Sequence, residues 1–179
     1  MEQITIFTRR HNARRNRSFL DPSYVLEKIT YRLTGSVTEG ILRSEVRRAG
    51  FAPKVVELSD SMQVKTTRGN VALISVNDPI TLVYAIENKR ELDRRFKVLV
   101  FGGQLPSLTP WLVRKFFPEA NIFSGECEGR IALVLEDACS VKVGVDYSAP
   151  TYDIQRSYVV PERAGKSIVE EVELGRGCS

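Results

Sequence analysis

Short apolar runs alternate along the chain with longer segments whose apolar residues repeat every three or four positions. The runs are rich in Ile, Val and Phe, and uninterrupted apolar runs of strand length are typical of strands buried on both faces. We predict five strands, at residues 3–8, 54–58, 70–76, 96–103 and 121–123, and the segment 142–146 is compatible with one more.

Amphipathic helices are predicted between these strands. Asp21-Pro22 begins the first, because Asp caps a helix and Pro fits its first turn, and Gly35 ends it. Ser36 and Glu39 have capping-box spacing at the start of the second, which Gly50 closes. Further helices are predicted from Asp78-Pro79 into the charged segment 89–95, from Thr109-Pro110 to Pro118, and over 128–138, whereas the polar stretch 59–69 carries no predicted element.

Repeated strand–helix units predict an α/β fold. Right-handed crossovers place the helices on both faces of a sheet, so we expect a Rossmann-like (flavodoxin-like), doubly wound and mostly parallel five-stranded sheet. The predicted domain spans residues 1–149. A connector is predicted over 150–167 and a strand over 168–174, because Pro and Gly break the earlier pattern there. Ligands of such sheets bind beyond the carboxyl ends of the strands, which selects the loops after Thr8, Ser75, Phe101 and Phe123.

The composition is that of an ordinary globular domain. The 179 residues are 42% hydrophobic and 27% charged, enough for a single buried core. No apolar run approaches the roughly 20 residues of a membrane span, and the amino terminus lacks the apolar stretch of a signal peptide. We therefore expect a cytoplasmic protein without a membrane partner.

Cysteine and histidine are too scarce for most catalytic or metal sites. Three widely spaced cysteines, Cys127, Cys139 and Cys178, do not describe a disulfide framework, and there is no CxxC pair for zinc. The single histidine, His11, cannot serve a Ser-His-Asp triad built elsewhere. The residues alone thus indicate a binding domain rather than a complete enzyme.

Positive charge is concentrated near the start of the chain. The net charge is +4, and the first 50 residues carry 10 Lys and Arg against 5 Asp and Glu. Five arginines fall between Arg9 and Arg17. This segment could contact phosphates of a nucleic acid or a small ligand, or it could be a solvated loop after the first strand.

Two strand ends carry candidate ligand-binding residues. Gly102-Gly103 follows a strand, where the lack of Cβ atoms lets a ligand approach the backbone, although a plain tight turn explains the pair equally well. The pattern is neither GxGxxG nor a phosphate-binding loop. At the preceding strand end, Ser75 and Thr81 could donate to a ligand, and helix capping by Asn77 or Asp78 is the alternative interpretation.

The turn Gly125-Glu126-Cys127-Glu128 is a third candidate. A helix dipole alone favours carboxylates at this place. Cys127 would have a lowered pKa at a helix start, or it is a buried and idle thiol.

These turns together resemble the amino-terminal cobalamin-binding domain of radical SAM enzymes. The resemblance covers about residues 40–179 and rests on Val71–Ser75, Val98–Gly103 and Phe123–Glu128, with the helix–strand unit Leu42–Leu58 in front of them. Members of that family often have a strand ending in Ser, a strand ending in Gly-Gly, and a Gly-Glu-x-Glu turn. The segment Glu171–Cys178 resembles the entry to the radical SAM domain, so residues 150–179 would be a connector and the start of a truncated radical SAM domain.

The resemblance implies roles for individual residues. Ser75 and Thr81 would lie near the nucleotide tail of cobalamin. Gly102, Gly103 and Gln104 would line its edge, and Gly125 and Glu126 would close the third side. Cys178 would be the first ligand of an iron-sulfur cluster, which needs two further cysteines, so the cluster and S-adenosylmethionine belong to a longer parent chain.

The Asp-x-His-x-x-Gly motif of cobalamin-dependent mutases is absent, which agrees with the radical SAM class, whose members commonly lack it. Two other functions stay open. The chain could be a Rossmann-like interaction or scaffold module without a cofactor, in which case Gln104, Leu105 and Trp111 would fill the cleft at the sheet edge. It could also bind phosphate or nucleic acid through Arg9–Arg17, although nucleic acid is the less favoured partner because no aromatic residues interleave the arginines.

Overall fold

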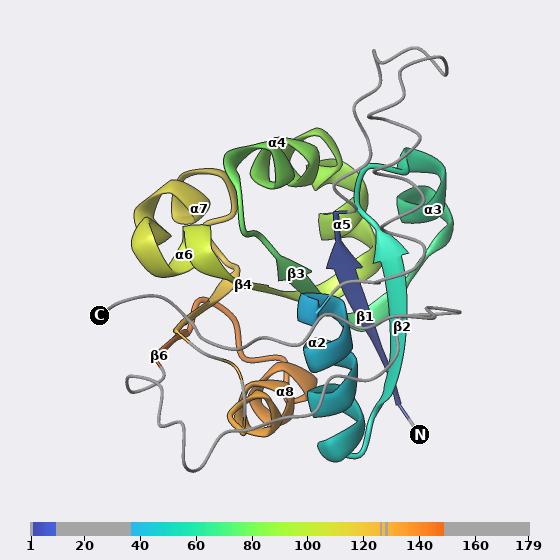
Figure 1. The fold of residues 1–179 in the computed structure, drawn as a ribbon. Helices are drawn as coiled ribbons and strands as arrows, with labels where there is room; N and C mark the ends of the chain where they lie inside the picture. The colour runs from blue at the N-terminus through green and yellow to red at the C-terminus, as the bar shows by residue number, and fades with distance from the viewer. Residues whose placement is uncertain (1, 10–36, 126, 128, 149–179) are drawn as a thin grey trace, which may run out of the picture.

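The computed structural model describes residues 2–9, 37–125, 127 and 129–148 (Figure 1). The helix predicted at 21–35, most of the arginine-rich segment, and the predicted connector and strand beyond 149 lie outside the described residues. The strands are β1 (Gln3–Thr8), β2 (Ala52–Glu57), β3 (Gly69–Ser75), β4 (Phe96–Gly102), β5 (Asn121–Ser124) and β6 (Asp146–Ser148). The helices are α2 (Val37–Arg48), α3 (Ser61–Thr66), α4 (Pro79–Glu87), α5 (Lys89–Arg95), α6 (Gln104–Leu108), α7 (Pro110–Phe116) and α8 (Ile131–Cys139).

The six strands of the described residues form one sheet in the order β2-β1-β3-β4-β5-β6, and every neighbouring pair is parallel. The predicted Rossmann-like, doubly wound architecture is therefore confirmed. The predicted count of five strands is wrong, because β6 adds a sixth at the β5 edge. The candidate segment 142–146 overlaps β6 only at Asp146; the chain needs residues 140–145 to return from α8 before it can pair with β5.

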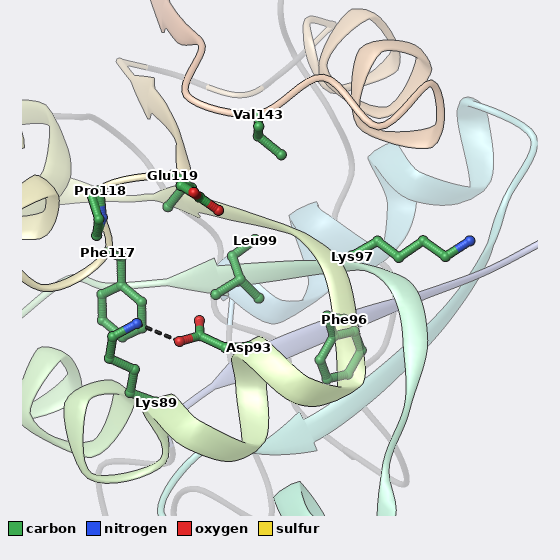
Figure 2. A pocket seen from close by; sticks show the side chains of 10 residues that line it. Lys89, Asp93, Phe96, Lys97, Leu99, Phe117, Pro118, Glu119 and Val143 are labelled. Carbon is green, nitrogen blue, oxygen red and sulfur yellow. Dashed lines mark hydrogen bonds and ion pairs between the residues drawn. The ribbon is translucent and has the colours of Figure 1, made fainter.

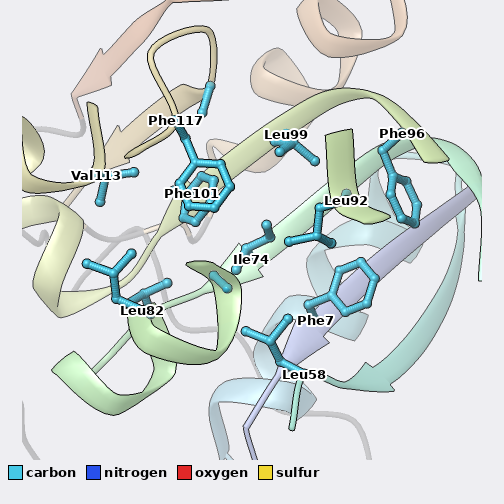
Figure 3. Packing of buried hydrophobic residues seen from close by; sticks show 14 of the residues in the cluster. Phe7, Leu58, Ile74, Leu82, Leu92, Phe96, Leu99, Phe101, Val113 and Phe117 are labelled. Atoms are coloured by element: carbon cyan, nitrogen blue, oxygen red, sulfur yellow. The ribbon is translucent and has the colours of Figure 1, made fainter. Parts of the chain in front are cut away.

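Helices cover both faces of the sheet, and each face has its own apolar cluster. On the α2/α8 face, Leu42 and Val46 of α2 and Leu135 of α8 pack on Ile6 and Leu73. On the opposite face, which we call the α3–α7 face, the cluster contains Phe7, Phe96, Phe101 and Phe117 among its buried residues (Figure 3). The rings of Phe101 and Phe117 lie 4.7 Å apart at their centroids, and those of Phe7 and Phe96 meet edge to face at 5.5 Å. Figure 1 shows α2 and α8 on one side of the sheet and α4, α6 and α7 on the other.

Four helical details differ from the sequence predictions, and local hydrogen bonds account for the first two. The stretch 59–69 contains α3, whose N-terminus Asp60 caps by accepting from the N–H groups of Met62 and Gln63. The helix predicted from Asp78-Pro79 through 95 is two helices, because the buried Asn88 donates its side-chain amide to Tyr84 O and Leu58 O. The short helix α6, with Pro106 inside it, precedes the predicted helix at Pro110, and α8 begins at Ile131 rather than 128. Among the described helices, none has the length and apolar character to cross a bilayer.

Candidate functional site

The sheet has a topological switch point between β1 and β3. These strands are neighbours in the sheet, but α2, the first described helix after β1, packs on one face, whereas α4, which follows β3, packs on the other. In open α/β sheets, ligands usually bind beyond the strand ends at such a switch point. The candidate site is therefore built from the residues that end β1, β3 and β4.

Three short residues lie side by side across these strand ends. Ser75 is in register with Gly102, and Thr8 follows the pair Phe7 and Ile74, so it lies beside Ser75. Alternation along the strands puts all three on the α2/α8 face, where Thr8 and Ser75 are buried. We call Thr8, Ser75 and Gly102 the small-residue row. Short side chains at this position let a bulky ligand approach the backbone closely.

Gly103 belongs to the turn itself. Its φ is 107°, and a Cβ there would lie 2.6 Å from Asn77 Oδ1 and 2.8 Å from Val76 O. The Val76 carbonyl accepts from Leu105 N at 3.0 Å, and Asn77 Oδ1 accepts from Gln104 N at 3.2 Å. The loops after β3 and β4 are thus bound to each other, and the tight-turn interpretation accounts for Gly103.

Asp78 caps α4, as the capping alternative anticipated. Its Oδ1 accepts from Thr81 N at 2.9 Å, and its Oδ2 accepts from the Thr81 hydroxyl at 2.9 Å. Partial burial works to raise the pKa of Asp78, but these two hydrogen bonds and the charge of Arg9 outweigh it, so the pKa lies below its usual value. The hydroxyl of Thr81, which the resemblance assigns to a cofactor, is occupied by Asp78.

Arg9 crosses the switch point. It is the residue after β1, and its Nη1 donates to Asp78 Oδ1 at 2.8 Å while its guanidinium lies 5.9 Å from the centre of the Tyr84 ring. Only 9% of the Arg9 side chain is exposed. Its Nε is buried and has no hydrogen-bond partner in the part of the chain that the structure describes.

The turn after β5 is held from two directions. Ser107 donates its hydroxyl to Gly103 O at 2.8 Å and accepts from Gly125 N at 2.9 Å, which joins the ends of β4 and β5. From the other side, Glu45 of α2 accepts from Gly129 N at 2.6 Å through a carboxylate that is almost wholly buried. The turn at Gly125, the third candidate from the sequence, therefore lies beside the turn at Gly103.

The structure brings together most of the predicted site residues that it describes. Ser75, Gly102, Gly103 and Gly125 converge at the carboxyl edge. Gln104 contributes its backbone N–H and has an exposed side chain, whereas Glu126 and Cys178 lie outside the described residues. Arg9 and Ser107 were missed as single site residues. The position of Arg9 directly after the first strand could have indicated it, but no sequence signal singled out Ser107.

A cavity of about 240 Å³ lies at the opposite edge of the sheet, near the starts of β4 and β5 (Figure 2). Leu99 and Phe117 form apolar parts of its wall, and Lys89 and Asp93 are paired beside them. The ammonium of Lys89 also lies 4.9 Å from the centre of the Phe117 ring. Lys89 and Asp93 satisfy one another, and the other two charged residues of its lining, Lys97 and Glu119, are exposed to water.

The described residues do not supply a metal centre. No group of three or more His, Cys, Asp or Glu side chains among them could hold a metal ion. Cys127 packs partly buried against the α2/α8 cluster and lies four residues before α8 begins, so the predicted helix-start position is wrong. Burial, and then the nearby Glu2, raises the pKa of Cys139, which makes this thiol a poor nucleophile.

Comparison with known proteins gives one structural relative and no sequence relative. No family model and no curated protein sequence matches the chain. A solved structure is similar with a TM-score of 0.50 and 14% identity, covering 97% of this chain and 23% of the other: the cobalamin-dependent S-adenosylmethionine radical enzyme OxsB with aqua-cobalamin bound. The chain thus spans under a quarter of the protein it resembles, and at this identity the likeness shows a shared fold.

Proposed function

We propose that this domain binds cobalamin at the carboxyl edge of its sheet and forms the cofactor-binding part of a radical SAM type enzyme. The observation that carries the proposal is the small-residue row at the switch point of an all-parallel sheet. The fold shared with a cobalamin-dependent radical SAM enzyme supports it, and so do the strand-end residues on which the sequence resemblance rests.

The residues present fit a large ligand of this kind. Thr8, Ser75 and Gly102 keep the strand ends free of bulk on the α2/α8 face. The buried Arg9 Nε lies on the α4 side of the same strand ends and has no partner among the described residues, which leaves a donor for a polar group of a ligand. A module without a cofactor would be expected to fill this edge with its own side chains, such as Gln104, Leu105 and Trp111. Here Trp111 is 65% exposed and Gln104 is exposed, whereas Leu105 packs against the α3–α7 cluster. The described side chains therefore fill the edge only slightly.

This chain would supply binding and orientation. Cobalamin, when bound, supplies methyl transfer or modulation of a radical reaction in such enzymes, and the protein positions it. The row would lie against the nucleotide tail, and the turns at Gly103 and Gly125 would border the ring. These turns are tied together through Ser107, so the edge is preorganised before a ligand arrives. Any iron-sulfur cluster and S-adenosylmethionine would require further protein.

The direct test is a spectroscopic titration of the purified protein with hydroxocobalamin. We expect saturable changes in the cobalamin absorbance at tens of micromolar or below. Gly102→Ala should weaken binding roughly tenfold, because a methyl group would be added where the ligand approaches the backbone. The protein itself tolerates that methyl group, since the nearest atom to it would be Phe123 Cβ at 3.7 Å.

Gly69→Ala is the matched control. Gly69 begins β3 at the opposite edge, and its added Cβ would lie 3.4 Å from the Phe96 ring, an ordinary contact. We expect wild-type affinity for this variant. Absence of saturable binding by the wild type, or equal effects of the two substitutions, would contradict the proposal.

A further inference from the structure

Arg9 has more hydrogen-bonding capacity than the described residues use. A guanidinium offers five N–H donors. Nη1 donates to Asp78, and Nε is buried without an acceptor among the described residues. An unsatisfied buried donor is costly, so native structures rarely retain one without a reason. Arg43 Nε is also buried without a partner among the described residues. However, 23% of the Arg43 side chain is exposed, against 9% of the Arg9 side chain, so water reaches Arg43 more readily.

Asp78 does not require Arg9 in order to cap α4. Both of its carboxylate oxygens already accept from Thr81, one from the N–H and one from the hydroxyl. The pairing with Arg9 therefore holds the arginine at the switch point more than it holds the helix. The Tyr84 ring, 5.9 Å from the guanidinium, supports Arg9 from the side of α4.

We infer that Arg9 recognises an anionic group of the ligand, and that for cobalamin this group is the phosphodiester of the nucleotide loop. The inference rests on the proposed function. Arginine binds phosphate oxygens through a pair of parallel N–H donors. Arg9 would turn from Asp78 toward the ligand, which satisfies Nε, and Asp78 would keep its two bonds from Thr81.

The test compares cobalamin with cobinamide, which lacks the phosphate, ribose and base of the nucleotide loop. Both are titrated spectroscopically into the wild type, Arg9→Met, Arg9→Lys and the control Arg94→Met. Methionine keeps the length of the apolar stem and removes every donor. Arg94 pairs with Glu91 on α5, at the other end of the sheet, and its side chain is 62% exposed. Urea unfolding of each variant checks that the fold is intact.

We expect Arg9→Met to weaken cobalamin binding by roughly tenfold to a hundredfold, the usual effect of losing a hydrogen bond to a charged group. Its cobinamide affinity should not change. Arg9→Lys should recover part of the loss, because it keeps the charge but not the paired donors, and Arg94→Met should match the wild type for both ligands.

Two results would overturn the inference alone. If the wild type binds cobalamin but Arg9→Met weakens both ligands equally, Arg9 acts only on the structure of the edge; if it weakens neither, Arg9 does not contact the ligand. A wild type that binds neither ligand refutes the proposed function and the inference with it. If Arg9→Met does not fold, the ratio of the two affinities in Arg9→Lys decides, because lysine can still pair with Asp78.

Discussion

The two ends of the parallel strands differ in what they offer a ligand. The edge at which the strands begin, which we call the amino edge, has a cavity of about 240 Å³, but Lys89 and Asp93 beside it are paired with each other. The carboxyl edge has short side chains and a buried arginine with an unused donor. None of the buried polar atoms that lack a partner among the described residues lines the amino-edge cavity. A buried donor that lacks a partner indicates a ligand site more strongly than a cavity whose charged side chains are paired or exposed to water.

A single arginine ties together the loops at the amino edge. Arg114 donates to the carbonyls of Pro118 at 3.0 Å, Ala120 at 2.7 Å and Gly144 at 3.1 Å, and it pairs with Asp146. These bonds hold the loops that lead into β5 and β6. The hydrogen bonds of Arg114 thus stabilise the fold, whereas Arg9 keeps a buried Nε donor that no described residue accepts from.

Of the substitutions that test this comparison of the two edges, Gly103→Ala is expected to have the largest effect on stability. Gly103→Ala should lower the free energy of unfolding by about 3 kcal/mol, because alanine is strained at this backbone conformation and its Cβ would collide with the loop after β3. Gly50→Ala is the control: Gly50 has a φ of 87° but nothing within 4 Å of an added Cβ, so about 1 kcal/mol is expected. Urea denaturation measures both, and equal losses would show that the contact between the two loops is unimportant.

Periodicity was sufficient to predict the sheet and its faces. Apolar runs located β1 to β5 within a few residues, because buried strands need continuous apolar character. β6 has the sequence Asp-Tyr-Ser and joins the sheet through backbone pairing with β5, which no apolar pattern reports. α3 depends likewise on one capping carboxylate, Asp60.

The location of the candidate site was predictable from the sequence, but most of its contacts were not. Topology selected the strand ends, and Ser75, Gly102 and Gly125 do converge there. The sequence could not show that Thr81 is bound by Asp78 or that Arg9 reaches across 69 positions to the same carboxylate. Long-range pairs of this kind depend on strand order, which becomes visible only when the sheet is assembled.

Glu45 offers the next largest test, because it supports the carboxyl edge from α2. Glu45→Met should cost about 2 kcal/mol of unfolding free energy, since the N–H of Gly129 would lose its acceptor in a buried setting. Glu91→Met is the matched change at the other edge, where Glu91 pairs with Arg94 and Arg95 at the surface, and little change is expected. Thermal or urea unfolding reports both values. A larger loss for Glu91→Met would reverse the contrast between the two edges.

Acid should weaken the Asp78 cap. The pKa of Asp78 in the folded protein lies below its ordinary value of 3.8, so the carboxylate stabilises the fold above that pH and loses this contribution as the pH falls through the folded pKa. Asp78→Asn should therefore show a shallower loss of stability below pH 3.8 than the wild type, by roughly 1 kcal/mol at most. Urea unfolding between pH 5 and pH 2, the range over which such carboxylates titrate, measures the difference. Parallel curves would show that the charge of Asp78 does not matter.

The smallest effect is expected when the amino-edge cavity is filled. Val143 lines this cavity and is 46% exposed, so Val143→Trp can place its ring over the opening without disturbing the buried core. If the carboxyl edge holds the ligand, hydroxocobalamin should bind this variant with an affinity within about twofold of the wild type, a difference of under 0.5 kcal/mol. A tenfold loss, with the unfolding free energy unchanged, would instead place the ligand at the amino edge. Empty volume would then have been the better guide to the site than unmet hydrogen bonds, and the paired Lys89 and Asp93 would have to separate to bind it.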